Sequence, residues 1–432
     1  MSHKWFLALL LYIGFSLSGN LTGLAQEQSG TPAEKWFRGN LHTHSLWSDG
    51  NDFPEMITKW YQDNGYHFLA LTDHNILSEG EKWISEDQIR KRGNDKTIEN
   101  LVAAFGSDWI DRRVKDDVSQ IRLKGLAEFR NKFEQRGKFL MMTGEEISDS
   151  VEGLPLHMNA TNLESVIQPA GGKSIVEAMN NNLRIALEQS KTIGRPILVH
   201  LNHPNYGWAV TAEDLAQVTL ERFFEVYNGH PEINHLGASG RPSVERLWDI
   251  ANTLRVDQLN TEPLLGLATD DSHHYNGTGK SRPGRGWVMV RASELSPDSI
   301  IRSMNRGNYY CSSGVKLLDL NVDDQAIELK MSPRDGVTYT TEFIGTLISY
   351  DRSSKKGVLI KNSKGKPLRI SRVYSDDVGR VLKRVDGNSA SYRFSGNEIY
   401  VRALITSSVD HPDPSFKNQK QQAWTQPIVV KK

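Results

Sequence analysis

The chain has 432 residues with 38% hydrophobic and 24% charged residues, so we expect a large folded core and not intrinsic disorder. Lys and Arg together number 52 and equal Asp and Glu, so the charge balance indicates neither a nucleic-acid nor a membrane-surface partner. The single cysteine, Cys311, excludes an intramolecular disulfide and a thiolate-rich zinc site. We interpret it as a small buried side chain.

The first 25 residues have the pattern of a secretory signal peptide. Lys4 supplies a positive charge, Trp5 to Leu17 is an apolar run, and small residues at positions 23–25 offer a cleavage site. A polar linker follows at 26–35, and the rest of the chain has no apolar stretch of membrane length. We therefore predict export, to the periplasm or the exterior, with an uncleaved membrane anchor as the alternative.

Residues 36–312 alternate short apolar runs with amphipathic segments. Strands are predicted at 36–41, 66–71, 138–143, 196–201, 222–227 and 264–268, and helices at 53–64, 174–192 and 243–254. Gly65 and Gly194 follow the first two helices, where a left-handed cap is expected. This alternation favours an α/β domain with a parallel sheet, open or closed into a barrel.

Two regions depart from this alternation. An insert at 78–136 carries two charged helical patterns, at 86–105 and 112–133, and serves either as surface decoration or as a lid over the site. From residue 313 to 432 short strand-like runs alternate with turns, at 316–322, 338–346, 357–361, 391–394 and 399–405. We predict a small antiparallel β-sandwich domain there.

Polar residues, most of them of types that can bind metals, follow or lie within each predicted strand of the first domain. In chain order they are His42, His44, Asp49, Asp73, His74, Glu145, Glu146, His200, His203, Glu225, Asn228, His230, Asp270, Asp271, His273 and His274. In a parallel barrel the carboxyl ends of all strands open on one face, so these residues converge. Imidazole and carboxylate without thiolate suit zinc, manganese or iron in a hydrolytic site.

These motifs resemble the polymerase and histidinol phosphatase (PHP) family of metal-dependent hydrolases. The resemblance rests on Leu-His-Thr-His at 41–44 with Ser-Asp-Gly at 48–50, Thr-Asp-His-Asn at 72–75, Gly-Glu-Glu at 144–146, Asn-His-Pro at 202–204 and Asp-Asp-Ser-His at 270–273. The export pattern, the insert and the closing Ala-Trp-Thr-Gln-Pro at 423–427 look like its carbaryl-hydrolase-like branch.

The resemblance implies a distorted seven-stranded (β/α) barrel over 36–312 that holds two to three divalent metal ions. By motif position, His42, His44, Glu146 and Asp271 would hold one metal, Glu146 with His157 and His203 a second, and Asp49, His74 and His273 a third. The family's glutamate precedes an aliphatic residue and Ser or Thr, which selects Glu146 over Glu145.

We expect a hydrolase in which a hydroxide shared between metals is the nucleophile. Three divalent ions carry about six positive charges against three carboxylates, which favours a phosphoester as substrate. Amide, carbamate or ester hydrolysis is the alternative, and aromatic residues from the insert such as Trp83 or Trp109 would favour it. A third interpretation is a carbohydrate- or surface-binding protein with a degenerate metal site, although Tyr339 and Tyr350 are too few to indicate sugar binding.

The remaining candidate residues surround these motifs. Asp73, His200 and His274 are candidates for proton transfer, with orientation of the metal-bound imidazoles as the alternative for Asp73 and His200. Glu225 and Asn228 either support the ligands or touch a small-molecule substrate. Arg282 and Arg285 form either a phosphate clamp or a surface loop. The oligomeric state is left open.

Overall fold

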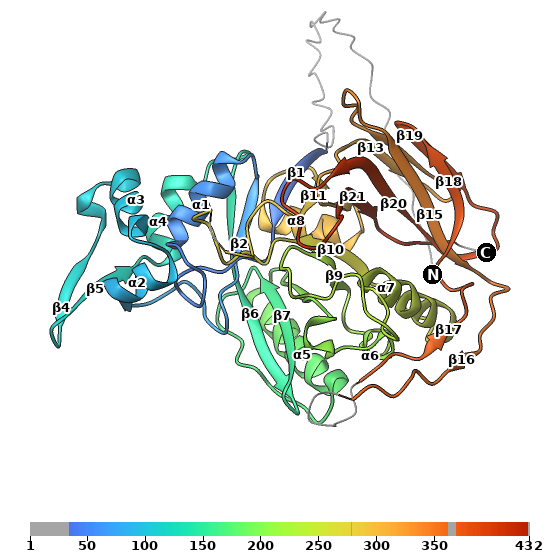
Figure 1. Cartoon of the computed structure of the whole chain (residues 1–432), viewed down its shortest axis with the longest axis horizontal. Helices are drawn as coiled ribbons and strands as arrows, with labels where there is room; N and C mark the ends of the chain where they lie inside the picture. Colours follow the sequence, from blue (N-terminus) through green and yellow to red (C-terminus); the bar gives the residue numbers. More distant parts are fainter. Residues whose placement is uncertain (1–33, 278, 362–368, 431–432) are drawn as a thin grey trace, which may run out of the picture. The chain divides into compact units, whose positions relative to one another are not determined.

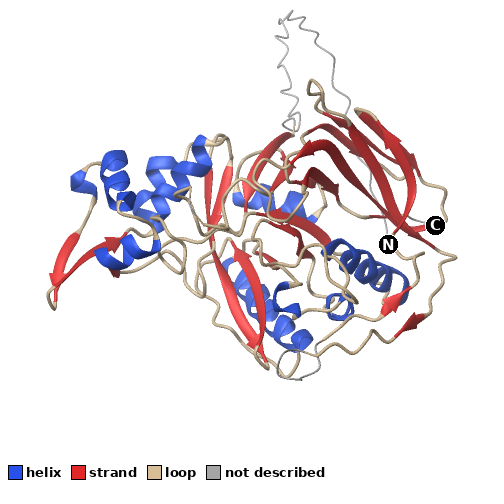
Figure 2. Cartoon of the chain, in the orientation of Figure 1, coloured by secondary structure: helices blue, strands red, loops and turns tan. Residues whose placement is uncertain are grey.

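The computed structural model describes residues 34–277, 279–361 and 369–430 (Figure 1). The predicted signal peptide lies outside the described residues, as does most of the predicted linker. The described residues from Glu34 onward form one compact unit. It is a mixed α/β fold with a large sheet, as the coloured elements in Figure 2 show.

The large sheet has 14 strands. Its order is β10 (Leu265–Thr269), β9 (Phe223–Asn228), β8 (Leu198–Leu201), β7 (Leu154–Thr161), β6 (Leu140–Val151), β2 (Phe68–Leu71), β1 (Lys35–Asn40), β11 (Trp287–Ala292), β12 (Tyr309–Ser312), β21 (Lys420–Thr425), β20 (Glu398–Asp410), β15 (Tyr339–Leu347) and β18 (Arg380–Asp386), with β22 (Ile428–Val429) paired to β20. All six strands predicted for the first domain are present.

The predicted parallel sheet is interrupted by β7, which the sequence analysis missed. The pairs β1–β2, β2–β6, β8–β9 and β9–β10 are parallel, whereas β7 runs antiparallel to both β6 and β8. A tight turn at Glu152 and Gly153, both with positive φ, reverses the chain between β6 and β7. This hairpin lets His157 face Glu146 from the neighbouring strand.

The two ends of this strand series meet beside the predicted site. The segment after β1 pairs with the segment after β10 through a bridge between Thr43 and Ser272. The His44 amide donates to the Ser272 carbonyl at 3.0 Å, and the Asp271 amide to the His42 carbonyl at 3.0 Å. The ladders themselves do not close in the described chain, so a closed barrel stays a prediction.

Helices flank the strands; those over 54–63, 175–193 and 244–253 lie close to the predicted positions, and two others were not predicted. The helices are α1 (Pro54–Asp63), α5 (Ile175–Ile193), α6 (Ala212–Gln217), α7 (Val244–Thr253) and α8 (Pro297–Asn305), with short helical turns η2 (Tyr206–Trp208) and η3 (Leu254–Gln258). Ser174 caps α5 by accepting the Glu177 amide, and Gly194 ends it in the left-handed conformation, as predicted.

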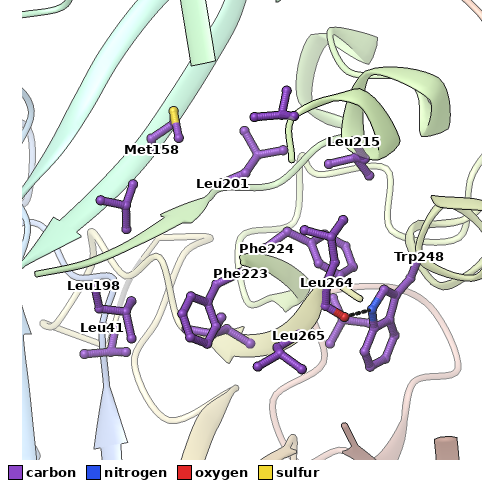
Figure 3. Packing of buried hydrophobic residues seen from close by; sticks show 14 of the residues in the cluster. Leu41, Met158, Leu198, Leu201, Leu215, Phe223, Phe224, Trp248, Leu264 and Leu265 are labelled. Carbon is purple, nitrogen blue, oxygen red and sulfur yellow. Dashed lines mark hydrogen bonds between the residues drawn. The ribbon is translucent and has the colours of Figure 1, made fainter. Parts of the chain in front are cut away.

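The core between these layers is apolar and closely packed. Figure 3 shows leucines of β8, phenylalanines of β9 and Trp248 of α7 pointing into one cluster. The indole of Trp248 donates to the Leu264 carbonyl at 2.9 Å, so its only polar atom is satisfied inside the core. Cys311 is fully buried, as expected.

The insert combines a small sheet with three helices. It contains β3 (Lys82–Ser85), α2 (Glu86–Arg92), α3 (Lys96–Phe105), η1 (Ser107–Trp109), β4 (Arg112–Lys115), β5 (Val118–Leu123) and α4 (Leu126–Phe133). The helical prediction for 112–133 was wrong over its first half, because Asp116 and Asp117 adopt positive φ and turn the chain into a hairpin. Ile89, Ile98 and Ile121 of the insert pack in one cluster with Leu46 and Trp47.

The predicted C-terminal sandwich is represented by two facing layers. A three-stranded sheet of β13 (Leu317–Val322), β14 (Ala326–Met331) and β19 (Ser389–Arg393) shares an apolar cluster with β15, β20 and β21 of the large sheet. A short pair, β16 (Ser354–Lys355) with β17 (Val373–Tyr374), lies outside both sheets, and the strand predicted at 357–361 is absent there. Because β12 pairs with β21, the two halves share one sheet, and the boundary at 312/313 stays a prediction.

Candidate metal centre

A cavity of about 310 Å³ opens where the strand ends converge. Its lining includes Asp49, His74, Glu146, His157, His203, Asp271 and His273, and the lining residues outside the predicted ligand set are Tyr206, His230, Glu232, Ile233 and His274. His42 and His44 are fully buried beneath them. The structure thus brings together all nine residues that the sequence predicted as metal ligands.

The first predicted group surrounds a single point. The Nε2 atoms of His42 and His44 lie 3.1 Å apart, and each is 3.3 Å from Asp271 Oδ1. Glu146 closes the group, with Oε1 3.5 Å from His42 Nε2 and Oε2 3.3 Å from His44 Nε2. Asp271 adopts φ +48, a left-handed backbone conformation that is uncommon outside glycine and that Asp tolerates better than most residues.

Glu146 also faces the second predicted group. Its Oε1 lies 3.0 Å from His157 Nδ1 and 3.6 Å from His203 Nε2. Asn202 donates to the same oxygen at 2.8 Å. Glu145 points away from the cavity and accepts the Ile167 amide, which agrees with the choice of Glu146.

The third predicted group gathers around Asp49. The Asp49 Oδ1 atom lies 3.4 Å from His273 Nε2, and Oδ2 lies 3.4 Å from His74 Nε2. His44 Nδ1 is 3.6 Å from Asp49 Oδ1, so the two ring nitrogens of His44 face two different groups. Asp49 is the most exposed member, with 55% of its side chain accessible.

The carboxylates and imidazoles perturb one another strongly. Burial opposes ionisation of Asp271 and Glu146, yet the surrounding histidines hold the pKa of both carboxyls well below the usual range. Burial likewise opposes protonation of His74, but Glu146 and Asp49 raise its pKa to about 11. For His44, burial and the charge of His273 prevail and lower the pKa to about 4.

The arrangement fits divalent cations. Four sets of three or four donor atoms lie within 4.8 Å of one another, and three of these sets consist of the predicted ligands. Within the described chain the buried Glu146 Oε2 has no hydrogen-bond partner, although imidazole nitrogens of His74 and His44 lie at 2.8 and 3.3 Å. A buried carboxylate that faces several imidazole nitrogens is costly unless a shared cation compensates its charge.

The fourth set combines His42 and His200 with Glu225, which supports the ligands from behind. Glu225 Oε1 lies 2.7 Å from both His42 Nδ1 and Thr269 Oγ1. Its Oε2 accepts the His203 amide and the Asn228 side chain, both at 2.8 Å. Glu225 therefore contacts a predicted ligand and not the cavity.

Asn228 links this support to Asp271. Its Nδ2 donates to Asp271 Oδ2 at 3.0 Å as well as to Glu225, and the residue is 2% exposed. Asn228 therefore orients a predicted metal ligand, and its contact with substrate stays a prediction.

The proton-transfer candidates occupy three different environments. Asp73 accepts hydrogen bonds from the amides and hydroxyls of Ser45 and Ser48 at 2.6–3.0 Å, and so fixes the turn before Asp49. His200 is fully buried with Nε2 3.5 Å from Glu225 Oε1, and burial lowers its pKa. Of the three, only His274 lines the cavity.

Arg282 and Arg285 lie at a contact with the C-terminal half of the chain. Arg285 is 2% exposed and donates to both carboxylate oxygens of Asp413 at 3.0 Å and to the carbonyls of Gly229 and Lys280. Arg282 also donates to Asp413. These protein acceptors occupy the guanidinium groups, which disfavours the phosphate clamp and favours a structural role.

The insert supports the Asp49 turn from outside the cavity. Arg92 of α2 donates to the Ser48 carbonyl at 2.5 Å, and Lys82 of β3 contacts the Trp47 carbonyl. Trp83 stacks under Arg113, and Trp109 donates to Glu55 at 2.9 Å. Neither tryptophan is among the described residues that line the cavity. The insert was predicted to be surface decoration or a lid, and neither prediction includes this support of the Asp49 turn.

Sequence reasoning missed Asn202, Ser148 and Tyr206, and it assigned no role to His230. Ser148 Oγ lies 2.5 Å from His74 Nδ1. The Asn-His-Pro motif at 202–204 contains Asn202, so the sequence could have indicated this residue. No motif contains Tyr206, so nothing in the sequence indicated its place at the cavity. The described part of the chain has no helix long and apolar enough to span a membrane.

Comparisons with known proteins give weak matches only. No protein-family profile matches the chain, and neither does any curated protein. A two-domain protein from Bacteroides vulgatus that contains a predicted PHP-like metal-dependent phosphoesterase aligns with 15% identity and a TM-score of 0.39, over 92% of this chain and 98% of that one. A protein from Bifidobacterium adolescentis described as a metal-dependent phosphoesterase aligns with 14% identity and a TM-score of 0.27, over 61% and 94%. Similarity at this level supports no assignment of function.

Proposed function

We propose that the chain is a metal-dependent hydrolase with two to three divalent ions and that phosphoesters are its preferred substrates. The observation that carries the proposal is the convergence of nine imidazole and carboxylate side chains on one cavity. They come from segments up to 231 positions apart, between His42 and His273. A packed core alone would not gather so many ionisable groups, because their burial is costly without cations.

His42, His44, Glu146 and Asp271 would hold one ion, Glu146, His157 and His203 a second, and Asp49, His74 and His273 a third. Bound there, zinc, manganese or iron would lower the pKa of a coordinated water and polarise the substrate's oxygen. Glu225 and Asn228 orient His42 and Asp271, and Ser148 orients His74.

An anionic substrate is favoured because three divalent ions would outweigh the four carboxylates that line the cavity. Aromatic residues from the insert at the site would favour carbon-centred hydrolysis, but Trp83 and Trp109 are engaged elsewhere. The sugar-binding alternative is not supported either, because Tyr339 and Tyr350 are 2% and 5% exposed. We further propose export, from the pattern of residues 1–25, and closure of a seven-stranded barrel through the Thr43–Ser272 bridge.

The test compares two neighbouring glutamates that face opposite sides of β6. Protein lacking residues 1–25 is purified as wild type, Glu146→Gln and Glu145→Gln, and bound metal is measured by elemental analysis. Each sample is then assayed with manganese, iron or zinc on bis-p-nitrophenyl phosphate, p-nitrophenyl phosphate, p-nitrophenyl acetate and an aryl carbamate.

We expect two to three metals per wild-type chain, with metal and phosphoesterase activity lost in Glu146→Gln and kept in Glu145→Gln. The control is matched because both residues are buried glutamates of the same strand and both substitutions keep the size of the side chain. Turnover of the acetate or carbamate alone would replace the phosphoester preference by carbon-centred hydrolysis. A folded wild-type protein that binds no metal would refute the proposal.

A further inference from the structure

Apart from the proposed metal ions, an anionic substrate in this cavity would be recognised by neutral donors. The described lining residues include no Lys or Arg, and the two arginines near the last motif bind Asp413. Apart from the predicted metal ligands, the lining side chains that carry a donor are Tyr206, His230 and His274. The phosphoryl oxygens that are not on metals would therefore need these groups.

The position of His230 is coupled to the metal centre through Asn228. The His230 amide donates to Asn228 Oδ1 at 2.7 Å, and Asn228 Nδ2 donates to Asp271 Oδ2 at 3.0 Å. The His230 ring lies beside that of His273, with centroids 5.6 Å apart and planes at 72°. The residue that follows the fifth strand is thus held at the wall of the cavity.

One ring nitrogen of His230 is already occupied. Its Nδ1 accepts the main-chain N–H of Glu232 at 3.2 Å. A main-chain amide only donates, so Nδ1 is the unprotonated nitrogen and the ring proton resides on Nε2. Within the described residues Nε2 has no hydrogen-bond partner, which leaves one donor available to a ligand.

We propose that His230 is a substrate-binding residue whose Nε2–H donates a hydrogen bond to a phosphoryl oxygen of the substrate. The inference rests on the proposed phosphoesterase function, because an oxyanion is the acceptor that such a donor favours. His230 acts as a neutral donor and not as a general acid. To transfer a proton and end neutral, the ring would need a second proton on Nδ1, which the Glu232 amide occupies.

The test uses two substitutions that separate the two ring nitrogens. His230→Asn keeps an acceptor near the Nδ1 position and removes the distal donor, whereas His230→Gln places an amide donor near the Nε2 position. His67→Asn is the matched control, because His67 Nδ1 accepts the Arg38 amide at 3.0 Å and the residue is outside the cavity lining.

Metal content, the Kd of inorganic phosphate by calorimetry and the pH profile of kcat/KM on bis-p-nitrophenyl phosphate are measured for the metal-loaded proteins. We expect unchanged metal content throughout. Phosphate binding should weaken about tenfold in His230→Asn, the loss of one hydrogen bond to a charged group. His230→Gln should regain part of that affinity with the wild-type pH profile, and His67→Asn should match wild type.

Each other outcome identifies what failed. Loss of metal in both His230 variants would make His230 a ligand and overturn the inference. Wild-type phosphate affinity in His230→Asn would overturn it as well. The loss of one limb of the pH profile of kcat/KM in His230→Gln would also overturn it, because it would show that His230 transfers a proton. If the metal-loaded wild type neither binds phosphate nor hydrolyses phosphoesters, the proposed function itself is refuted, and the inference with it.

Discussion

Replacement of Glu225 by Gln tests whether this carboxylate sets the tautomer of His42. A carboxylate offers acceptors only, and Glu225 uses its two oxygens for four donors: the His42 ring, the Thr269 hydroxyl, the His203 amide and the Asn228 side chain. The His42 proton is thereby fixed on Nδ1, which leaves the Nε2 lone pair facing Asp271 and Glu146.

A glutamine has to place its NH₂ group on one of the two sides. On the Oε2 side it would face the His203 main-chain N–H, which cannot become an acceptor, and an opposed buried donor costs about 1–3 kcal/mol. On the Oε1 side the NH₂ faces Thr269, whose hydroxyl can turn, and His42, whose ring proton can move to Nε2. The second arrangement is cheaper, and it blocks the metal-binding nitrogen of His42.

We therefore expect Glu225→Gln to lose about 10- to 100-fold in metal affinity, the range typical of such supporting residues, which corresponds to about 1.4–2.7 kcal/mol. The unfolding free energy of the metal-free protein should fall less, by about 1–2 kcal/mol. Competition with a chromophoric chelator gives the metal Kd, and urea denaturation gives the stability.

Glu145→Gln serves as the control, since Glu145 is equally buried and contacts the Ile167 amide instead of a ligand. If Glu225→Gln bound metal within twofold of wild type while folded, the tautomer argument would be refuted. A large loss of stability without a change in metal affinity would also contradict it.

Three further predictions concern the surroundings of the site. Burial raises the pKa of Glu221 to about 8, so the folded state binds more protons than the unfolded state between pH 4.5 and 8. The unfolding free energy should therefore fall as pH rises through that window, by up to about 1.4 kcal/mol per pH unit. Urea denaturation at pH 5–9 measures this dependence, and Glu221→Gln should flatten it. Arg92→Gln should loosen the Asp49 turn and weaken the last metal to bind by about 2- to 10-fold, one hydrogen bond's contribution, whereas an unchanged stepwise metal titration would show that this contact is dispensable. Glu232 is the one described lining carboxylate outside the predicted ligand set, so Glu232→Gln should tighten phosphate binding severalfold in calorimetry, and weaker binding would contradict the expected repulsion.

The amino-acid sequence determined the set of metal-binding side chains and the strands that carry them. Each of the six predicted strands is present, and all nine predicted ligands meet around one cavity. This worked because strand periodicity and the ends of strands are local properties. A His or Asp that follows an apolar run is therefore placed by the run itself.

Pairing partners were decided by tertiary structure. The antiparallel β7 escaped prediction because its run at 154–161 mixes polar and apolar residues, and its two edges pair with β6 and β8 only in the folded chain. The sequence of the β4–β5 hairpin resembles a helix in its charge pattern. The chain reverses there because Asp116 and Asp117 adopt positive φ angles in the turn, which the charge pattern does not reveal.

Roles that depend on contacts between distant segments were also beyond the sequence. Arg285 next to the last motif suggested a phosphate clamp, but Asp413, 128 positions later, binds its guanidinium. The sequence indicated only that His230 follows a predicted strand. In the folded chain the Glu232 amide occupies Nδ1 and leaves Nε2 as the donor, and Asn228 links His230 to Asp271. Local pattern thus determines which side chains reach the cavity. Hydrogen bonds formed only in the folded chain decide which of their atoms face it, because each donor and acceptor there is shared with a partner remote in sequence.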